Sequence, residues 1–268
     1  MKKIILLVAT MALFAGALAA EDQLVITGST TVLPVAQACA EEYMDANPKA
    51  DITVRGGGSG VGIAALIDEQ CDIAMSSRDI KEKEIETARD KGVEPVEHVV
   101  ALDALAIVVN PKNKVSKLTL EQVKAIYTGE ITNWKELGGK DQDIVIVSRD
   151  VSSGTFEVFK EIVLKGGAVH ESALKLASNQ AVVTTVGNTP DAIGYVGLGY
   201  LNSKIKAVSV DGVDASVKTA QSGEYALVRK LNMYSKGAPT GSAKAYLDFV
   251  LSSTGQEIVS ELGFVPVK

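Results

Sequence analysis

The sequence has too few cysteines and histidines for a metal site. Its only candidates, Cys39, Cys71, His98 and His170, lie in unrelated contexts, so the spacings typical of zinc sites are missing. We therefore expect no metal and no cofactor. In an oxidising compartment the two cysteines can pair, and two buried free thiols are an equal alternative, because nothing in the sequence fixes the distance between them.

The sequence also lacks any run rich in lysine or arginine, and its formal net charge is −6. Nucleic acids are bound mainly through clustered basic residues that contact phosphates. We therefore expect no nucleic-acid partner. A small anionic ligand would have to be held by groups placed locally around it.

The first residues have the pattern of an export signal. Lys2 and Lys3 precede an apolar run over residues 4–18, which ends in small residues. The run is too short for a permanent membrane anchor, and no cysteine for lipid attachment stands at the cleavage point after Ala19. The pattern predicts a cleaved signal peptide over residues 1–19 and a periplasmic or extracellular protein. Removal of the signal peptide, which contains Lys2 and Lys3, takes the formal net charge from −6 to −8.

Short apolar runs that end in small polar turns recur along the chain, and helical patterns follow most of them. Strands that alternate with helices predict the α/β class, with mostly parallel strands covered on both faces. In such sheets, ligands bind where the carboxyl ends of strands meet the starts of helices. The polar turns at this type of position are residues 28–31, 55–62, 76–79 and 149–155.

The turn from Arg149 to Thr155 has the features of an anion site. The amides in the first turn of a helix have no intrahelical partner, so Ser153, Gly154 and Thr155 can direct N–H and O–H groups at one point. Arg149 adds a charged fork suited to phosphate or carboxylate oxygens. The alternative is that Ser153 only caps the helix and Arg149 is a surface charge.

The glycine-rich turn supports the anion site. Glycines at 56–58 and 60 let the backbone approach a ligand closely, while Ser59 can cap the following helix and still offer its hydroxyl. The turn lacks the Gly-Lys-Ser/Thr ending of a nucleotide P-loop and the spacing of a dinucleotide fingerprint. A flexible linker is disfavoured, because a strand pattern precedes the turn and a helical pattern follows it at once.

The middle and the end of the chain add further strands. Residues 93–100 and 104–109 are predicted as two strands on either side of Asp103, and residues 227–234 as a late strand. The single tryptophan, Trp134, is interpreted as a packing residue, with ligand stacking as a less favoured role.

The ordered set of turns resembles the phosphate-binding proteins of bacterial and archaeal ABC phosphate importers, the PstS-type members of the type II periplasmic-binding-protein superfamily. The likeness spans nearly the whole chain after the signal. It implies two α/β lobes with mixed, mostly parallel sheets flanked by helices, joined by two crossing strands. Residues 24–103 and 230–268 would form one lobe and residues 104–229 the other. The motifs that carry the resemblance are Gly28-Ser29-Thr30-Thr31, Gly58-Ser59-Gly60, Ser76-Ser77-Arg78 and Arg149 with Ser153-Gly154-Thr155.

The resemblance implies that a monomer binds inorganic phosphate in the cleft and presents it to a membrane permease. Arg149 would be the only fixed positive charge on the ligand, while Arg55 and Arg78 would serve the surface or brace a turn. Many relatives have an aspartate at the position of Ser77 as acceptor for the proton of phosphate, and a bracing aspartate two residues after the arginine rather than at Asp150. The implied ligand contacts are Thr30, Thr31, Ser59, Ser77, Arg149, Ser153, Gly154 and Thr155.

Two other functions use the same residues. A hydrolase could use Ser59 or Ser153 as a nucleophile, but it needs a positioned base or metal. His98 lies in a strand-like run and His170 in a loop, so neither has the context of a catalytic triad, and we do not expect an enzyme. An anion sensor or adhesion protein without a transport role remains as a third hypothesis.

Overall fold

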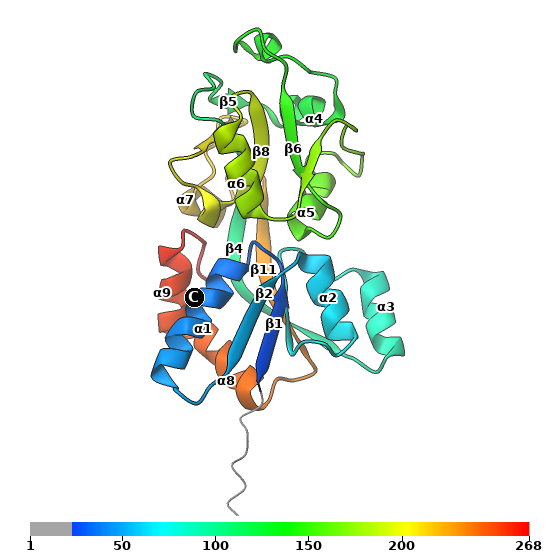
Figure 1. The fold of residues 1–268 in the computed structure, drawn as a ribbon, viewed down its shortest axis with the longest axis vertical. Coiled ribbons are helices and arrows are strands. Elements are labelled where there is room, and N and C mark those ends of the chain that lie inside the picture. Colours follow the sequence, from blue (N-terminus) through cyan, green and yellow to red (C-terminus); the bar gives the residue numbers. More distant parts are fainter. Residues whose placement is uncertain (1–22, 268) are drawn as a thin grey trace, which may run out of the picture.

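A computed structural model describes residues 23–267 of the protein. The predicted signal peptide, residues 1–19, lies outside this range. The described chain forms two α/β lobes, which Figure 1 shows one above the other with strands β4 and β11 passing between them. Within the described residues, no helix is long and apolar enough to cross a membrane.

One mixed sheet runs through both lobes, with the strand order β2-β1-β3-β11-β4-β8-β6-β7 and β9 paired to β4; β5 and β10 form a separate pair. Strands β1–β3 and β6–β8 are parallel within their lobes, and β11 and β4 add antiparallel pairs between them. The α/β class is confirmed. The strands are β1 (Leu24–Gly28), β2 (Ile52–Gly56), β3 (Ile73–Ser76), β4 (Pro95–Val109), β5 (Lys117–Leu118), β6 (Val145–Arg149), β7 (Leu174–Leu176), β8 (Ala192–Gly197), β9 (Lys206–Ala207), β10 (Ser209–Val210) and β11 (Val228–Lys236).

Lobe 1, defined here as the part that contains β1–β3, has helices on both faces of its sheet (Figure 1). Residues alternate along β1, so Leu24 and Ile26 enter the core shared with α1, α8 and α9, while Val25 packs on the other side with Leu66 of α2. This alternation is the ordinary consequence of the two-residue period of a strand. The helices are α1 (Leu33–Ala46), α2 (Ser59–Ile67), α3 (Glu82–Asp90), α8 (Gly241–Val250) and α9 (Ser253–Glu261).

Lobe 2, which contains β6–β8, is held by an aromatic core. The rings of Phe159 and Tyr195 stack with centroids 4.1 Å apart, and Tyr127 packs on both. Trp134 is 1% exposed and donates its indole N–H to the Asp191 carbonyl at 2.9 Å, which confirms its packing role. The helices are α4 (Leu120–Thr128), α5 (Gly154–Ile162), α6 (Asn179–Asn188) and α7 (Val217–Gln221), with short 3-10 turns at Trp134–Leu137 and Leu198–Tyr200.

Strand β4 corrects the prediction of two separate strands around Asp103. It runs unbroken for 15 residues; β11 pairs beside residues 95–104, and β8 pairs beside residues 105–109. A buried carboxylate does not interrupt the strand here, because Arg229 stands opposite it on β11 and neutralises it. The two lobes are therefore joined by one continuous antiparallel ladder.

The structure shows Cys39 and Cys71 as two buried free thiols, and burial raises the pKa of each to about 12. At about pH 8 only roughly one thiol in 10,000 would be ionised, and the thiolate is the reactive form. We expect the folded protein to react very slowly with Ellman's reagent and both thiols to react once guanidinium chloride unfolds the chain. Absence of reactive thiols in the unfolded chain would contradict this prediction and indicate a disulfide.

Candidate functional site

Three strand ends and two helix starts meet where the two lobes face each other. Lobe 1 contributes the turn after β1, the start of α2 and the end of β3, while lobe 2 contributes the end of β6 and the start of α5. All eight predicted ligand contacts lie in this region and are buried: Thr30, Thr31, Ser59, Ser77, Arg149, Ser153, Gly154 and Thr155. The sequence therefore located a real cluster of polar groups.

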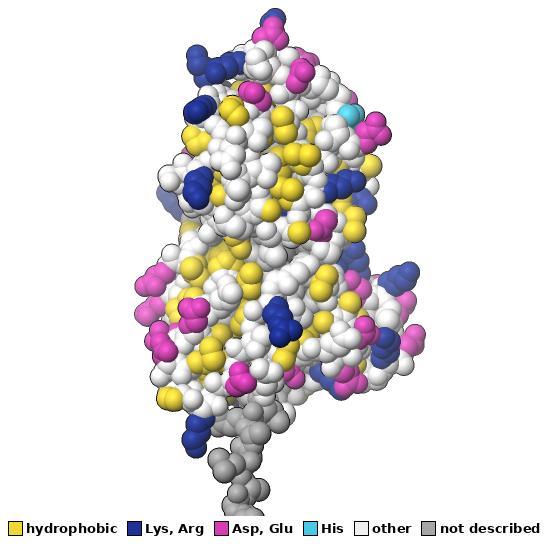
Figure 2. Space-filling view, in the orientation of Figure 1, with side chains coloured by type: hydrophobic (Ala, Val, Ile, Leu, Met, Phe, Trp, Pro, Cys, Tyr) yellow, Lys and Arg dark blue, Asp and Glu magenta, His cyan; other side chains and the backbone are white. Residues whose placement is uncertain are grey.

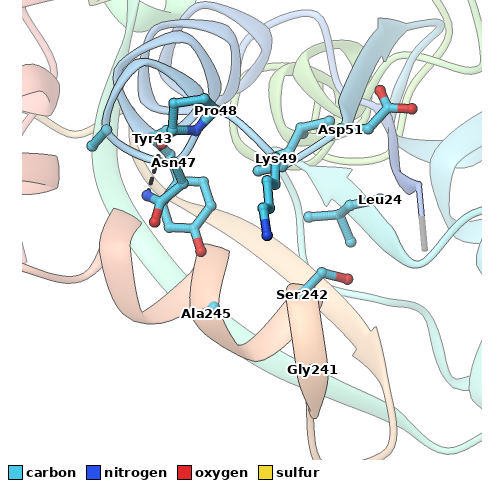
Figure 3. Close-up of a pocket in the computed structure, with 12 residues that line it drawn as sticks. Leu24, Tyr43, Asn47, Pro48, Lys49, Asp51, Gly241, Ser242 and Ala245 are labelled. Atoms are coloured by element: carbon cyan, nitrogen blue, oxygen red, sulfur yellow. Dashed lines mark hydrogen bonds between the residues drawn. The ribbon is translucent and has the colours of Figure 1, made fainter. Parts of the chain in front are cut away.

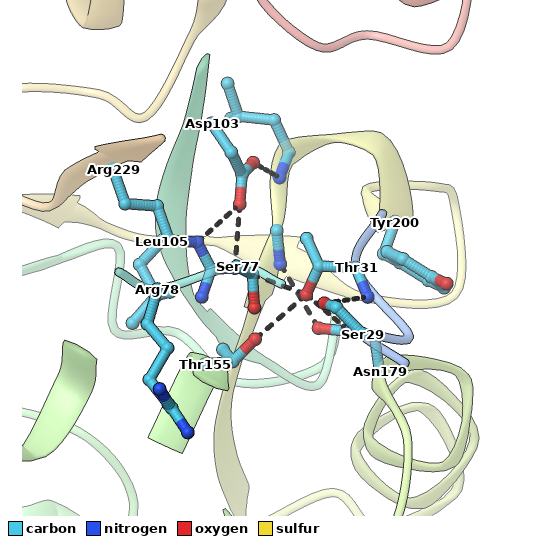
Figure 4. Close-up of polar contacts among 12 residues, drawn as sticks. Ser29, Thr31, Ser77, Arg78, Asp103, Leu105, Thr155, Asn179, Tyr200 and Arg229 are labelled. Carbon is cyan, nitrogen blue, oxygen red and sulfur yellow. Dashed lines mark hydrogen bonds and ion pairs between the residues drawn. The ribbon is translucent and has the colours of Figure 1, made fainter. Parts of the chain in front are cut away.

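The cluster spans the two lobes through direct contacts. The hydroxyls of Thr31 and Thr155 lie 2.9 Å apart, although 124 residues separate them in the sequence (Figure 4). Within lobe 1, the Ser59 hydroxyl lies 3.4 Å from that of Ser77. Gly154 packs so closely on these serines that a Cβ at its position would lie 2.2 Å from Ser59 Oγ. Only glycine fits at this point.

Arg149, the last residue of β6, is 2% exposed and is held by oxygen atoms without charge. Its Nε donates to the Leu176 carbonyl at 2.9 Å, and its Nη2 donates to the Ala177 carbonyl at 2.9 Å and to Thr30 Oγ1 at 3.2 Å. Its Nη1 has no hydrogen-bond partner among the described residues. Burial lowers the pKa of this guanidinium, because desolvation penalises the charged form. A buried donor of this kind is suited to an anion.

The start of α5 combines a side-chain cap with amides that the helix leaves free. Ser153 is the N-cap residue, and its hydroxyl accepts from the Phe156 amide at 3.2 Å. The amides of Gly154 and Thr155 lie in the first turn, where the helix provides no acceptor for them. The two interpretations of Ser153 are therefore compatible, because capping by its side chain fixes the neighbouring amides in place.

Ser59 does not cap its helix, which corrects the sequence prediction. Gly58 is the N-cap residue of α2, with a φ of 102° that favours glycine. Ser59 is the first helical residue, and its hydroxyl accepts from the Ser77 amide at 3.0 Å. The hydroxyl thereby links the start of α2 to the end of β3 inside the site.

Asn179 is a site residue that the sequence reasoning missed. It is the first residue of α6 and is fully buried, and its Nδ2 lies 2.9 Å from Thr31 Oγ1 and 3.2 Å from Thr30 Oγ1. Tyr200 also contacts the site, since its hydroxyl donates to the Thr30 carbonyl. Asn179 belongs to a further strand, turn and helix over residues 174–188, a pattern that could have indicated it. The pattern was not recognised because β7 has only three residues.

The nearby carboxylates are already engaged. Asp150 Oδ1 accepts from the amide and the hydroxyl of Ser152, so it stabilises the turn rather than bracing Arg149. Asp79 Oδ1 accepts from Asn232 Nδ2 at 3.3 Å. Arg78 makes a two-pronged ion pair with Glu84, which agrees with its predicted bracing role.

The features that a serine hydrolase needs are not assembled here. His98 bonds to Ser235 and His170 to Ser172, and neither bonds to Ser59 or Ser153. The described residues contain no group of three or more His, Cys, Asp or Glu side chains placed to hold a metal ion. On the face shown in Figure 2, lysines and arginines are interspersed with acidic side chains rather than gathered in a stripe.

A separate pocket of about 590 Å³ lies in lobe 1, between the end of α1, the segment entering β2 and the start of α8 (Figure 3). Its polar groups include Lys49, Asp51 and Ser242. None of the eight predicted residues lines it. It offers no buried guanidinium, in contrast to the interlobe cluster.

Fold and cluster together define the class of two-lobed proteins with a buried polar cluster between their lobes. A family model described as a PBP superfamily domain matches residues 15–254. The chain is 40% identical over 250 residues to the phosphate-binding protein PstS of Bacillus subtilis, covering 92% of this chain and 82% of that protein. It is 36% identical over 255 residues to PstS of Borreliella burgdorferi, covering 91% and 89%.

Solved structures agree with this result. A phosphate ABC transporter substrate-binding protein with bound phosphate from Clostridium perfringens matches with a TM-score of 0.86 at 36% identity, covering 92% of this chain and all of that chain. An ABC-type phosphate transport receptor from Vibrio cholerae matches with a TM-score of 0.73 at 32% identity, covering 91% and 99%. The chain belongs to the PstS family of phosphate-binding proteins within the PBP superfamily.

The close packing of Gly154 predicts a steric block. Gly154→Ala should keep the lobes from reaching the arrangement described here, because the added methyl group would overlap Ser59 and Ser77. In small-angle scattering with phosphate present, we expect a larger radius of gyration for Gly154→Ala than for wild type. Gly60→Ala is the matched control, since its Cβ would meet Ser152 at an ordinary 3.5 Å. Identical scattering of Gly154→Ala and wild type would contradict the prediction.

Proposed function

We propose that this protein captures inorganic phosphate between its lobes and delivers it to the permease of an ABC importer. The observation that carries the proposal is the buried, unpartnered Nη1 of Arg149, whose neighbouring Nη2 donates to the Thr30 hydroxyl of the other lobe. The relatives named PstS and the phosphate-bound structure from Clostridium perfringens support phosphate as the anion. The proposed contacts are Thr30, Thr31, Ser59, Ser77, Arg149, Ser153, Gly154 and Thr155.

The arrangement favours binding without a chemical step. Donors held in place in a buried site bind a dianion tightly, because each ligand oxygen is satisfied at little cost in ordering the donors. A hydrolase would also need a base beside its nucleophile. In this site the Ser59 hydroxyl accepts from the Ser77 amide and the Ser153 hydroxyl accepts from Phe156 N, so both have structural bonds.

The transport role requires export and movement of the lobes. We propose that residues 1–19 are a cleaved export signal and that the mature protein is a periplasmic or extracellular monomer. Residues 24–103 and 230–268 would form lobe 1 and residues 104–229 lobe 2, with the crossing at Asp103 and Arg229. Phosphate would favour closure, because both lobes donate to one anion.

The direct test is isothermal titration of the mature protein with phosphate, arsenate and sulfate. We expect saturable binding of phosphate and arsenate with one site per chain, and weaker binding of sulfate. Absence of heat and of any thermal shift with phosphate would refute the proposed function.

Arg149→Ala should weaken phosphate binding by at least about 2 kcal/mol, roughly thirtyfold in Kd, because the anion loses its buried charged donor. Arg55→Ala removes the same charge from an exposed position on β2 and serves as the control. We expect titration of Arg55→Ala to match wild type. Equal affinities of wild type and Arg149→Ala would remove Arg149 from the site.

Selectivity over sulfate depends on an acceptor for the proton of phosphate. Sulfate is fully ionised at neutral pH and needs only donors, whereas a buried P–OH without an acceptor is costly. Asp79 and Asp150 are engaged elsewhere, so the Ser77 hydroxyl is the available acceptor at this position. A hydroxyl rotates to suit either anion and is therefore a weaker discriminator than a carboxylate.

Ser77→Asp should raise the ratio of phosphate to sulfate affinity, since a carboxylate accepts the proton of phosphate and repels sulfate. Ser77→Asn is the control. Asparagine has nearly the same shape as aspartate, but it is uncharged and its NH₂ group can donate to sulfate. Competition titrations of the three proteins measure the ratio. If the aspartate and asparagine variants give the same ratio, the proton acceptor lies elsewhere.

A further inference from the structure

Arg229 stands at the crossing of the two strands that join the lobes. It pairs with Asp103 across β11 and β4, and its Nε and Nη2 donate to Asp103 Oδ2 at 3.0 and 2.7 Å. The other carboxylate oxygen accepts from the Leu198 amide at 2.8 Å. Burial raises the pKa of the Asp103 carboxyl, and the donors of Arg229 oppose this rise. The pair is therefore rigidly placed and almost completely buried.

The guanidinium of Arg229 also reaches the anion cluster. Its Nη2 lies 3.4 Å from Thr31 Oγ1, the hydroxyl that contacts Thr155 across the lobes and Asn179. Its Nη1 is buried and has no hydrogen-bond partner among the described residues. In Figure 4 the Arg229 side chain extends from the Asp103 carboxylate toward the group that contains Thr31 and Thr155.

Arg149 and Arg229 thus reach neighbouring hydroxyls. Arg149 Nη2 lies 3.2 Å from Thr30 Oγ1, and each guanidinium has one buried nitrogen without a partner. Leaving a charged N–H buried without an acceptor is costly, so two such groups beside adjacent residues point to a common acceptor. A phosphate dianion has enough lone pairs to accept from both.

We propose that Arg229 is a second ligand donor, oriented by Asp103, whose Nη1 binds a phosphate oxygen. This inference rests on the proposed function and revises the prediction that Arg149 is the only charged donor. Because Asp103 neutralises Arg229, the pair contributes a strong donor without adding net charge to the site. Asp103 is a positioning residue, since both of its oxygens already accept other donors.

A competing assignment is that Nη1 faces an interlobe groove rather than the anion cluster. Arg229 also lines an interlobe groove of about 770 Å³, where the carboxylates of Glu157 and Glu161 are possible acceptors. If groups in this groove satisfied Nη1, phosphate affinity would not depend on Arg229. The experiment below separates the two assignments.

The test compares wild type with Asp103→Asn/Arg229→Gln, which removes both charges without leaving either one unpaired. We expect phosphate to bind at least about tenfold more weakly to the double variant, because a neutral amide replaces the charged donor. Circular dichroism and the midpoint of thermal unfolding check that it folds. Equal affinity for phosphate in the folded double variant would overturn the proposal, while failure of wild type to bind would overturn the proposed function instead.

Arg229→Lys gives an independent reading if the double variant does not fold. Its single ammonium keeps the ion pair with Asp103 but loses the fork that reaches the ligand, so we expect a similar loss of affinity with little change in thermal stability. Nitrogen-15 spectra of arginine side chains should show two guanidiniums shifted by phosphate in wild type and one in Arg229→Lys. A single shifted guanidinium in wild type would assign Nη1 to the groove.

Discussion

The ion pair of Asp103 and Arg229 is the interaction on which the joining of the two lobes depends. A carboxylate in the middle of a buried strand is tolerated only with a partner that neutralises it and donors for its remaining lone pairs. Arg229 and the Leu198 amide supply these, so β4 continues through the crossing as one strand. The paired strands β4 and β11 therefore fix the lobes to each other at Asp103 and Arg229. The turns around the anion cluster are thereby held opposite each other.

The polar turns could be found from the sequence because they follow local rules. A strand that ends in Ser, Thr or Gly before a helical pattern has a recognisable composition, and four such turns define most of the cluster. Asn179 and Arg229 were missed for different reasons. Asn179 follows a three-residue strand, which is too short to give a periodic signal, and Arg229 acts through contacts 126 and 198 residues away, which no local pattern encodes.

The role of Asp150 shows a similar limit. Its place beside Arg149 in the sequence suggested pairing, but Asp150 lies just after the end of β6, and its carboxylate turns back onto Ser152. Arg149 instead relies on the carbonyls of Leu176 and Ala177 at the end of β7. Carbonyl dipoles orient a guanidinium without cancelling its charge, so its full attraction for an anion is retained.

Because the hydroxyls of Thr31 and Thr155 already bond to each other, binding of an anion exchanges one set of hydrogen bonds for another. An anion that enters the cluster replaces hydrogen bonds between neutral groups with bonds to charged oxygens, and the number of bonds changes little. Affinity then reflects the difference in strength between the two kinds of bond rather than their sum. Loss of the ligand from the closed lobes is then less costly, because the hydroxyls of Thr31 and Thr155, one from each lobe, can bond to each other once the anion has left.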